Sequence, residues 1–250
     1  MAPSTAPLHL ETPAHERLIV ALDVDDAGTA RTIVSELKGS VGAFKIGLQL
    51  FTSAGPSLVK DICEAGVRIF LDLKFHDIPN TVTKASLEAS KLGVWMFNMH
   101  ASGGAAMMRQ ATQEVEEFCD RASLTKPLII GVTVLTSASD QELREIGIDK
   151  SAIDQVLALS MLANSCGLDG VVASPLEAKR IREQARTEFV IVTPGIRPKT
   201  ATHDDQKRVM SPGEALSAGS DYLVVGRPVI GAADRIAAVD AIISEIAQFS

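Results

Sequence analysis

The sequence predicts an α/β fold, a single-domain (β/α)8 TIM barrel, because short apolar runs alternate with helical patterns about eight times along the chain. The chain has 250 residues, which suits one such barrel, and its 46% hydrophobic residues are sufficient for a large core. An open doubly wound sheet is the alternative fold. Its dinucleotide-binding form has no support, because no Gly-x-Gly-x-x-Gly motif follows the first apolar run.

The N-terminal segment differs in composition from the rest of the chain. Residues 1–16 are rich in Pro, Ala, Thr and Ser, and they lack the apolar centre of a signal peptide. We therefore expect a flexible tail over residues 1–16 and one barrel domain over residues 17–250.

Four apolar runs in the first half of the chain are predicted to be strands, with helices between them. Asp25 or Asp26 can cap the first helix, Gly39 can end it, and Asn80 can cap the helix after the third strand. The expected strands cover residues 18–24, 43–48, 67–75 and 95–100. The first expected helix ends at residue 37, and the next three cover about residues 57–65, 81–92 and 103–122.

The second half of the chain continues the same alternation of apolar strands and helical segments. The expected strands cover residues 128–135, 170–174, 189–196 and 221–226, and the expected helices cover 140–145, 151–166, 175–185 and the segment from residue 234. Together the two halves supply the eight units that close a barrel.

Charged residues stand at the ends of the first three predicted strands. Asp23 ends the first, Lys45 lies in the second, and Asp72 and Lys74 end the third. Side chains alternate along a strand, so Asp72 and Lys74 point to the same side. Because barrel sites lie at the carboxyl ends of the strands, we expect these four charges to meet in one quadrant of the rim.

Two carboxylates interleaved with two ammonium groups predict acid–base chemistry at this rim. A nearby opposite charge favours the ionised form of each group, so the lysines are expected to be proton donors. Schiff-base lysines need burial or a cationic neighbour instead. Asp77 adds a further carboxylate just before the turn at Pro79. The alternative interpretation is an ordinary ion pair at the end of a strand.

The last two predicted strands end in residues that suit a phosphate group. Arg197 and Arg227 each follow a glycine-containing strand end, and glycine lets backbone N–H groups approach an anion. The loops after these strands hold phosphate in many barrels, although two surface arginines are the alternative. Residues 198–210 are polar and are expected to form a lid over the barrel mouth.

Composition restricts the class of partner. The net charge of −7 and the pI near 5.3 argue against a nucleic-acid or membrane surface, so a small molecule is the expected partner. No apolar run approaches the ~18 residues of a membrane span. Cys63, Cys119 and Cys166 form no CxxC pair, which disfavours disulfides and zinc and fits a reducing cytoplasm.

At DLKFHDIPNT the chain resembles the orotidine 5'-monophosphate decarboxylase family. The family signature is Asp-x-Lys-x-x-Asp followed by Ile-Pro-Asn-Thr, here Asp72, Lys74 and Asp77, with a separate lysine, here Lys45, on the preceding strand. Further motifs extend the resemblance over nearly the whole barrel: ALD at residue 23, TVLTS at 136, PGIR at 197, DDQKRV in the lid segment and VGRP at 227.

The resemblance implies conversion of orotidine 5'-monophosphate (OMP) to UMP and CO2 in de novo pyrimidine biosynthesis, without a metal or an organic cofactor. It implies that Lys74 stabilises the carbanion at C6 and delivers the proton, and that Asp72 lies beside the departing carboxylate. It also implies that Lys45 binds the ribose hydroxyls and orders the charges, and that Asp23 holds the ribose.

A homodimer with two shared sites is also implied by the resemblance, because in the family the residues matching Asp77 and Thr81 reach into the active site of the partner subunit. The remaining contacts that it implies are to the base and the phosphate. They are Thr136 to the base, Gln206 bridging base and phosphate from the lid, and Arg197, Gly226 and Arg227 to the phosphate.

The main alternative function is a Mg-dependent sugar-phosphate decarboxylase or synthase of the same barrel group. Those relatives carry an acidic residue at the end of the second strand, where this chain has Lys45. A barrel that only binds nucleotides is a second alternative. His100 is expected to be a hydrogen-bonded rim residue rather than a metal ligand, and His76 to shape the turn before Asp77.

Overall fold

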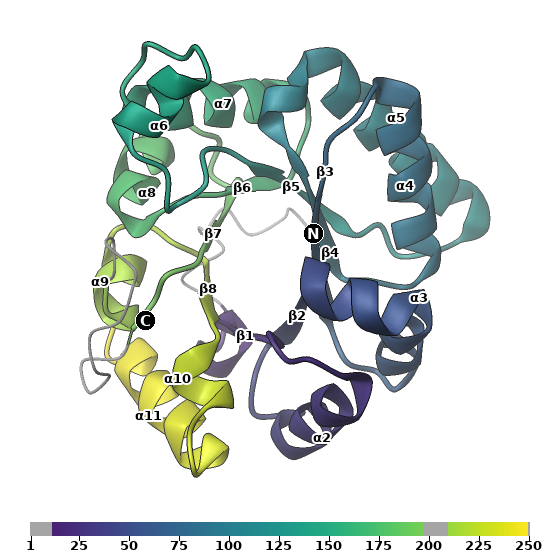
Figure 1. The fold of residues 1–250 in the computed structure, drawn as a ribbon, viewed down its shortest axis with the longest axis vertical. Coiled ribbons are helices and arrows are strands. Elements are labelled where there is room, and N and C mark those ends of the chain that lie inside the picture. The colour runs from purple at the N-terminus through teal and green to yellow at the C-terminus, as the bar shows by residue number, and fades with distance from the viewer. Residues whose placement is uncertain (1–11, 198–209, 250) are drawn as a thin grey trace, which may run out of the picture.

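Eight parallel strands close into a barrel in the order in which they occur along the chain (Figure 1). The computed structural model describes residues 12–197 and 210–249. The predicted (β/α)8 barrel is therefore confirmed. The strands are β1 (Leu18–Ala21), β2 (Ala43–Gly47), β3 (Ile69–Phe75), β4 (Met96–His100), β5 (Leu128–Val132), β6 (Gly170–Val172), β7 (Val190–Thr193) and β8 (Tyr222–Val225).

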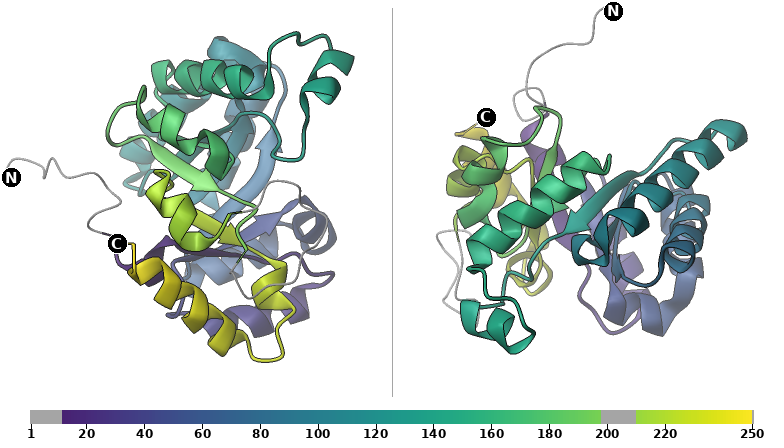
Figure 2. Two further views of the ribbon diagram at one scale, coloured as in Figure 1. Left: turned by 90° about the vertical axis from the view of Figure 1, so that its left-hand side faces the viewer. Right: turned by 90° about the horizontal axis from the view of Figure 1, so that it is seen from above.

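Helices surround the barrel on its outside, and Figure 2 shows α6 standing out from this ring. None of the helices in the described ranges is long and apolar enough to cross a membrane. The helical segments are η1 (Ala14–Arg17), α2 (Ala27–Leu37), α3 (Leu48–Glu64), α4 (Pro79–Lys91), η2 (Ala101–Gly103), α5 (Gly104–Ala122), α6 (Asp140–Glu145), α7 (Ala152–Ser165), α8 (Pro175–Arg182), α9 (Pro212–Ser217), α10 (Arg227–Ile230) and α11 (Arg235–Ala247).

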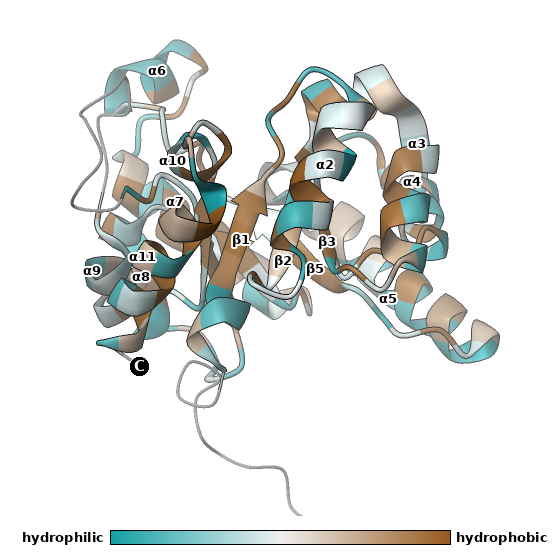
Figure 3. Cartoon of the chain, turned by 90° about the horizontal axis from the view of Figure 1, so that it is seen from below, coloured by the Kyte–Doolittle hydropathy of each residue, from teal (hydrophilic) through white to brown (hydrophobic). Residues whose placement is uncertain are grey.

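The barrel has an apolar interior and a second apolar layer between the strands and the helices, and Figure 3 shows the hydrophobic strands at the centre. Because side chains alternate along a strand, every second residue of each strand fills the interior. Its buried members are Ile19, Ala21, Ala43, Phe70, Met96, Ile130, Val190, Val192, Tyr222 and Val224. The interior is therefore a packed core that supports the residues at the carboxyl ends of the strands.

At the amino edge of the barrel, the half-buried Asp169 and the buried Asp221 connect neighbouring strands. Asp169 accepts a hydrogen bond from the Ile129 N–H at 2.8 Å, and Asp221 accepts one from the Ile191 N–H at 2.7 Å. Asp221 also pairs with Arg182 at 2.6 Å. These contacts satisfy buried polar groups at the end opposite the predicted site, so we assign them a structural role.

Residues on both sides of the expected boundary between tail and barrel form a short helix. Residues 1–11 of the expected tail lie outside the described residues, but Ala14–Arg17 forms the 3-10 helix η1 and Arg17 is buried. Glu16 pairs with Arg68 at 2.7 Å, and its backbone packs so closely on Gly42 that a β-carbon there would clash. The predicted boundary at residues 16 and 17 therefore falls inside a packed element.

Two helix starts differ from the prediction. Helix α3 begins at Leu48 rather than near residue 57, and it is kinked at Gly55, which has a φ of 72° that glycine tolerates. Helix α4 begins at Pro79, with Ile78 rather than Asn80 as its N-cap. Proline has the φ of a first-turn helical residue, and its missing N–H is not needed there, which explains the earlier start.

Candidate active site

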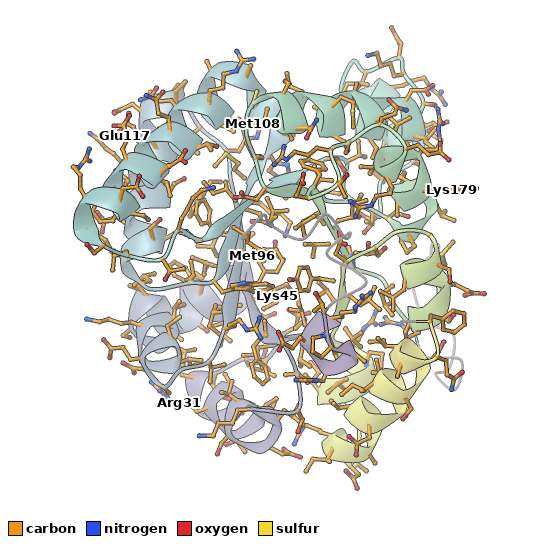
Figure 4. The ribbon with its side chains drawn as sticks, turned by 180° about the vertical axis from the view of Figure 1, so that it is seen from behind. Arg31, Lys45, Met96, Met108, Glu117 and Lys179 are labelled. Carbon is orange, nitrogen blue, oxygen red and sulfur yellow. The ribbon has the colours of Figure 1, made fainter. Side chains whose placement is uncertain are left out.

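A cavity of about 190 Å³ lies at the carboxyl ends of the strands. Residues of the strands and of the segments after β5 and β7 form its apolar wall, while Lys45, Asp72 and Lys74 supply charge. Figure 4 shows Lys45 near the centre of the ring. The loop after β5 adds Thr136, the residue expected to contact a base. The apolar lining residues are Phe70, Val132, Val134, Leu135, Val172, Val192, Pro194 and Val224.

The four charges predicted to meet at the rim form one continuous chain of alternating sign. The Lys45 Nζ lies 3.0 Å from Asp23 Oδ1 and 3.5 Å from Asp72 Oδ2, and the Lys74 Nζ lies 2.6 Å from Asp72 Oδ1. The side chain of Asp72 is 14% exposed and that of Lys45 is 12% exposed, whereas Asp23 is 55% exposed. The carboxylate of Asp72 therefore joins two ammonium groups in a largely buried position.

The barrel's alternation explains why these charges converge. Lys45 follows the interior residue Ala43 by two positions, and Asp72 follows the interior residue Phe70 by two. The charged side chains therefore continue the inward-facing rows of β2 and β3 at the open end of the barrel. Gly47 leaves the space that Lys45 occupies, because a β-carbon at Gly47 would lie 3.1 Å from Nζ.

Strand β3 is irregular at Lys74, which sequence reasoning did not predict. Between paired residues, β3 advances from Leu71 to Phe75 while β4 advances only from Phe97 to Met99. Lys74 has a φ of 54°, in the left-handed region, which costs on the order of 1–3 kcal/mol for a residue with a side chain. The surrounding structure must therefore hold this backbone in place.

Asn98 supplies that support, and it is the site residue that sequence reasoning missed. Its side chain on β4 is fully buried and bonds to both Lys74 and Asp72. The signal was present, since Asn98 is the one amide in the apolar run WMFNMH, and a buried amide needs hydrogen-bond partners. Its partners lie on another strand, so the sequence did not identify them.

His100 and His76 lie beside this site. Their rings contact each other with centroids 5.4 Å apart. The expected hydrogen bond of His100 stays a prediction, and the described ranges contain no cluster of three potential metal ligands. Burial lowers the pKa of His100, and the positive charges of His76 and Lys74 lower it further, against a smaller opposing effect of Asp72.

Asp77 and Thr81 lie on the outer surface beside the charge chain. Asp77 is exposed, and its Oδ1 accepts a hydrogen bond from the Ile78 N–H at 2.6 Å. Thr81 is exposed in the first turn of α4, and the neighbouring Ile78 is 66% exposed. Within the described part of the chain, Asp77 forms no ion pair with Lys45 or Lys74.

The residues expected to bind phosphate lie at the ends of β7 and β8. Arg227 is exposed at the start of α10, and Gly226 precedes it. A β-carbon on Gly226 would lie 3.4 Å from Asp23 Oδ2, so this glycine is adjacent to the charge chain. Arg197 is half-buried, and its N–H donates to the Met210 carbonyl at 3.0 Å. Gln206 and the expected lid, apart from Met210, lie outside the described residues.

A closed (β/α)8 barrel with alternating carboxylates and ammonium groups over its strand ends defines a barrel enzyme with an acid–base site. Within this class, the family model described as "Orotidine 5'-phosphate decarboxylase / HUMPS family" matches residues 16–242. The chain belongs to that family.

Individual relatives are similar to the chain over nearly its whole length. The orotidine 5'-phosphate decarboxylase of Syntrophotalea carbinolica is 51% identical and covers 94% of this chain and 96% of its own. The enzyme of the same name from Moorella thermoacetica is 50% identical, covering 93% of each chain. The crystal structure of the Lactobacillus acidophilus orotidine 5'-phosphate decarboxylase is 39% identical, covers 92% of this chain and 98% of its own, and has a TM-score of 0.82.

The lowered pKa of His100 predicts a loss of stability in mild acid. The unfolded chain binds the proton first as the pH falls below the ordinary value of 6.5, so His100 stabilises the fold above that pH and loses this contribution as the pH falls toward its lower folded pKa. We expect the free energy of unfolding to fall less steeply between about pH 7 and 5 in His100→Gln than in the wild type. Denaturant titrations at each pH measure this, and equal slopes would contradict it.

Proposed function

We propose that this protein is an orotidine 5'-phosphate decarboxylase that converts OMP to UMP and CO2 in pyrimidine biosynthesis. Membership of the family and relatives of that name at about half identity support this function. The observation that carries the proposal is the chain of alternating charges from Asp23 through Lys45 and Asp72 to Lys74 above an apolar cavity.

Lys74 is the proposed proton donor. When the bond between C6 and the carboxyl carbon breaks, CO2 leaves and the electron pair remains on C6 of the pyrimidine. The ammonium group of Lys74 stabilises that charge and transfers a proton to C6. Asp72, whose Oδ1 lies 2.6 Å from the Lys74 Nζ, holds this ammonium group and lies beside the departing carboxylate.

Lys74 alone does not supply enough stabilisation for this reaction. Enzymes lower barriers by roughly 8–23 kcal/mol, and a slow uncatalysed reaction needs the upper part of this range. One preorganised electrostatic donor supplies roughly 3–4 kcal/mol. Binding energy from the ribose and the phosphate must therefore also be expressed in the rate, as remote binding energy can be.

The remaining substrate contacts follow the rim of the barrel. Asp23 and Lys45 bind the ribose hydroxyls, because both lie between the reacting end of the site and Gly226. Thr136, which lines the cavity, contacts the base. The proposed phosphate ligands are Arg197, Gly226 and Arg227, with Gln206 bridging base and phosphate.

The proposed reaction uses neither a metal ion nor an organic cofactor. Lys45 occupies the position between Asp23 and Asp72, at 3.0 and 3.5 Å from their oxygens. A divalent cation prefers oxygen ligands and would be repelled by this ammonium group. This observation disfavours the Mg-dependent sugar-phosphate decarboxylase or synthase as the function of the chain.

We further propose that the active unit is a homodimer with two shared sites. Asp77 and Thr81 are exposed, and the Asp77 carboxylate accepts a hydrogen bond from the Ile78 N–H. The exposed side chain of Ile78 gives the same surface an apolar group that a partner subunit would cover. In the dimer, Asp77 and Thr81 complete the site of the other subunit.

The proposed location is the cytoplasm. Cys63, Cys119 and Cys166 are free thiols, and burial raises the pKa of Cys63 to about 11, which makes it unreactive. Three unpaired cysteines fit a reducing compartment. The proposed partners are OMP, UMP and a second copy of the chain, with no nucleic acid and no membrane.

The proposed activity is tested by adding OMP to the purified protein in excess EDTA and following the formation of UMP. We expect conversion, because the two lysine ammonium groups supply the positive charge that a metal ion supplies in a metal-dependent enzyme. Absence of conversion, combined with magnesium-dependent turnover of a sugar phosphate, would replace this function with the alternative one.

Shared sites are tested by mixing two inactive variants, Lys74→Ala and Asp77→Ala. In a heterodimer, the Asp77→Ala subunit retains Lys74 and receives Asp77 from its partner, so one of the two sites is intact. An equal mixture at random exchange contains half heterodimers, and we expect roughly a quarter of the wild-type activity. Each variant alone is the control. An inactive mixture with subunit exchange confirmed by mass spectrometry would contradict shared sites.

A further inference from the structure

We propose that Asn98 is a positioning residue for the decarboxylation, because it holds the backbone of Lys74 and the carboxylate of Asp72 with the two ends of a single amide. This inference rests on the proposed function, since it assigns Asn98 a role in the step that Lys74 performs. Asn98 lies in the middle of β4 and does not line the cavity, so its effect is transmitted through the residues of β3.

Both the oxygen and the nitrogen of the Asn98 side-chain amide form hydrogen bonds. Its Oδ1 accepts a hydrogen bond from the Lys74 N–H at 2.8 Å, and its Nδ2 donates to Asp72 Oδ1 at 2.7 Å. The side chain is fully buried, so no water replaces either contact without a rearrangement of the core. An amide is the neutral side-chain group that offers an acceptor and a donor at this spacing.

The bond to the Lys74 N–H explains how β3 tolerates its irregularity. The regular pairing of β3 with β4 stops at Leu71 and resumes at Phe75, so the N–H of Lys74 lies where the ladder is interrupted. Asn98 accepts this N–H in place of a strand carbonyl. The left-handed backbone of Lys74 is thereby fixed, and with it the point from which the lysine side chain extends.

The bond to Asp72 sets which carboxylate oxygen faces which lysine. Oδ1 receives both the Lys74 Nζ at 2.6 Å and the Asn98 Nδ2 at 2.7 Å, while Oδ2 lies 3.5 Å from the Lys45 Nζ. Rotation of the carboxylate would break the bond from Asn98. Asn98 therefore positions the donor lysine and the carboxylate relative to each other, as a reaction at C6 requires.

The test compares Asn98→Asp with the wild type across pH. An ionised Asp side chain at position 98 accepts from the Lys74 N–H but cannot donate to Asp72, and it places a second negative charge beside it. A protonated Asp side chain restores both hydrogen bonds. The other titratable groups near this position are Asp72 and Lys74 on β3, Lys45 on β2, and His100 with His76. The variant and the wild type both contain these groups. The ratio of variant to wild-type kcat at each pH therefore reports the effect of residue 98.

We expect the kcat of Asn98→Asp on OMP to be lower than that of the wild type by roughly 10²-fold at about pH 8, with KM changed by less than about threefold. The ratio of kcat values should rise as the pH is lowered toward about 5, as the added carboxyl is protonated. Asn98→Ala should lose activity at every pH, because it has neither a donor nor an acceptor.

The control is Asp169→Asn, which alters a half-buried side chain that accepts a hydrogen bond from a strand N–H at the opposite edge of the barrel, and it should keep the wild-type kcat. If Asn98→Ala does not fold, the near-isosteric Asn98→Asp carries the test. A kcat ratio that does not change with pH, or an effect of Asn98→Asp on KM alone, would overturn the positioning role of Asn98. Turnover of OMP by the wild type would still uphold the proposed function in that case. Absence of wild-type turnover would overturn both.

Discussion

The structure of this site depends on the shared carboxylate of Asp72. Lys74 contacts one of its oxygens at 2.6 Å and Lys45 lies 3.5 Å from the other, so two ammonium groups are held close together without an unfavourable accumulation of like charge. Asp23 balances Lys45 at the exposed end. Removing the carboxylate would leave two cations side by side above an apolar cavity. The positions of Lys45 and Lys74 therefore both depend on Asp72.

The barrel determines where this unit can form. The interior below it is packed with residues such as Phe70 and Met96, so the charges lie above the core, where Lys45, Asp72 and Lys74 line the cavity. Lys45 and Asp72 continue the same inward-facing rows as the apolar residues beneath them. The strands of the barrel therefore position these charged groups, while Arg197 and Arg227 follow the ends of β7 and β8.

Much of this arrangement could be predicted from sequence because it follows from alternation. Eight apolar runs predicted the closed barrel, and the charges at strand ends predicted the convergence of Asp23, Lys45, Asp72 and Lys74. The interruption of β3 and the role of Asn98 depend on pairing between β3 and β4, which the residues of neither strand reveal alone. The helix predicted from about residue 57 covers the part of α3 that follows the kink at Gly55, and the turns from Leu48 to that kink were missed.

Lys74 is the group proposed to stabilise the charge at C6 and to supply the proton, and the variant Lys74→Ala tests this role. Proton transfer and electrostatic stabilisation are lost together, so kcat should fall by roughly 10⁴-fold or more. The affinity for UMP, measured by calorimetry, should change by less than about tenfold, because the phosphate ligands are intact. Lys60→Ala, at an exposed ion pair on α3, is the control. A kcat near that of the wild type would rule out this role for Lys74.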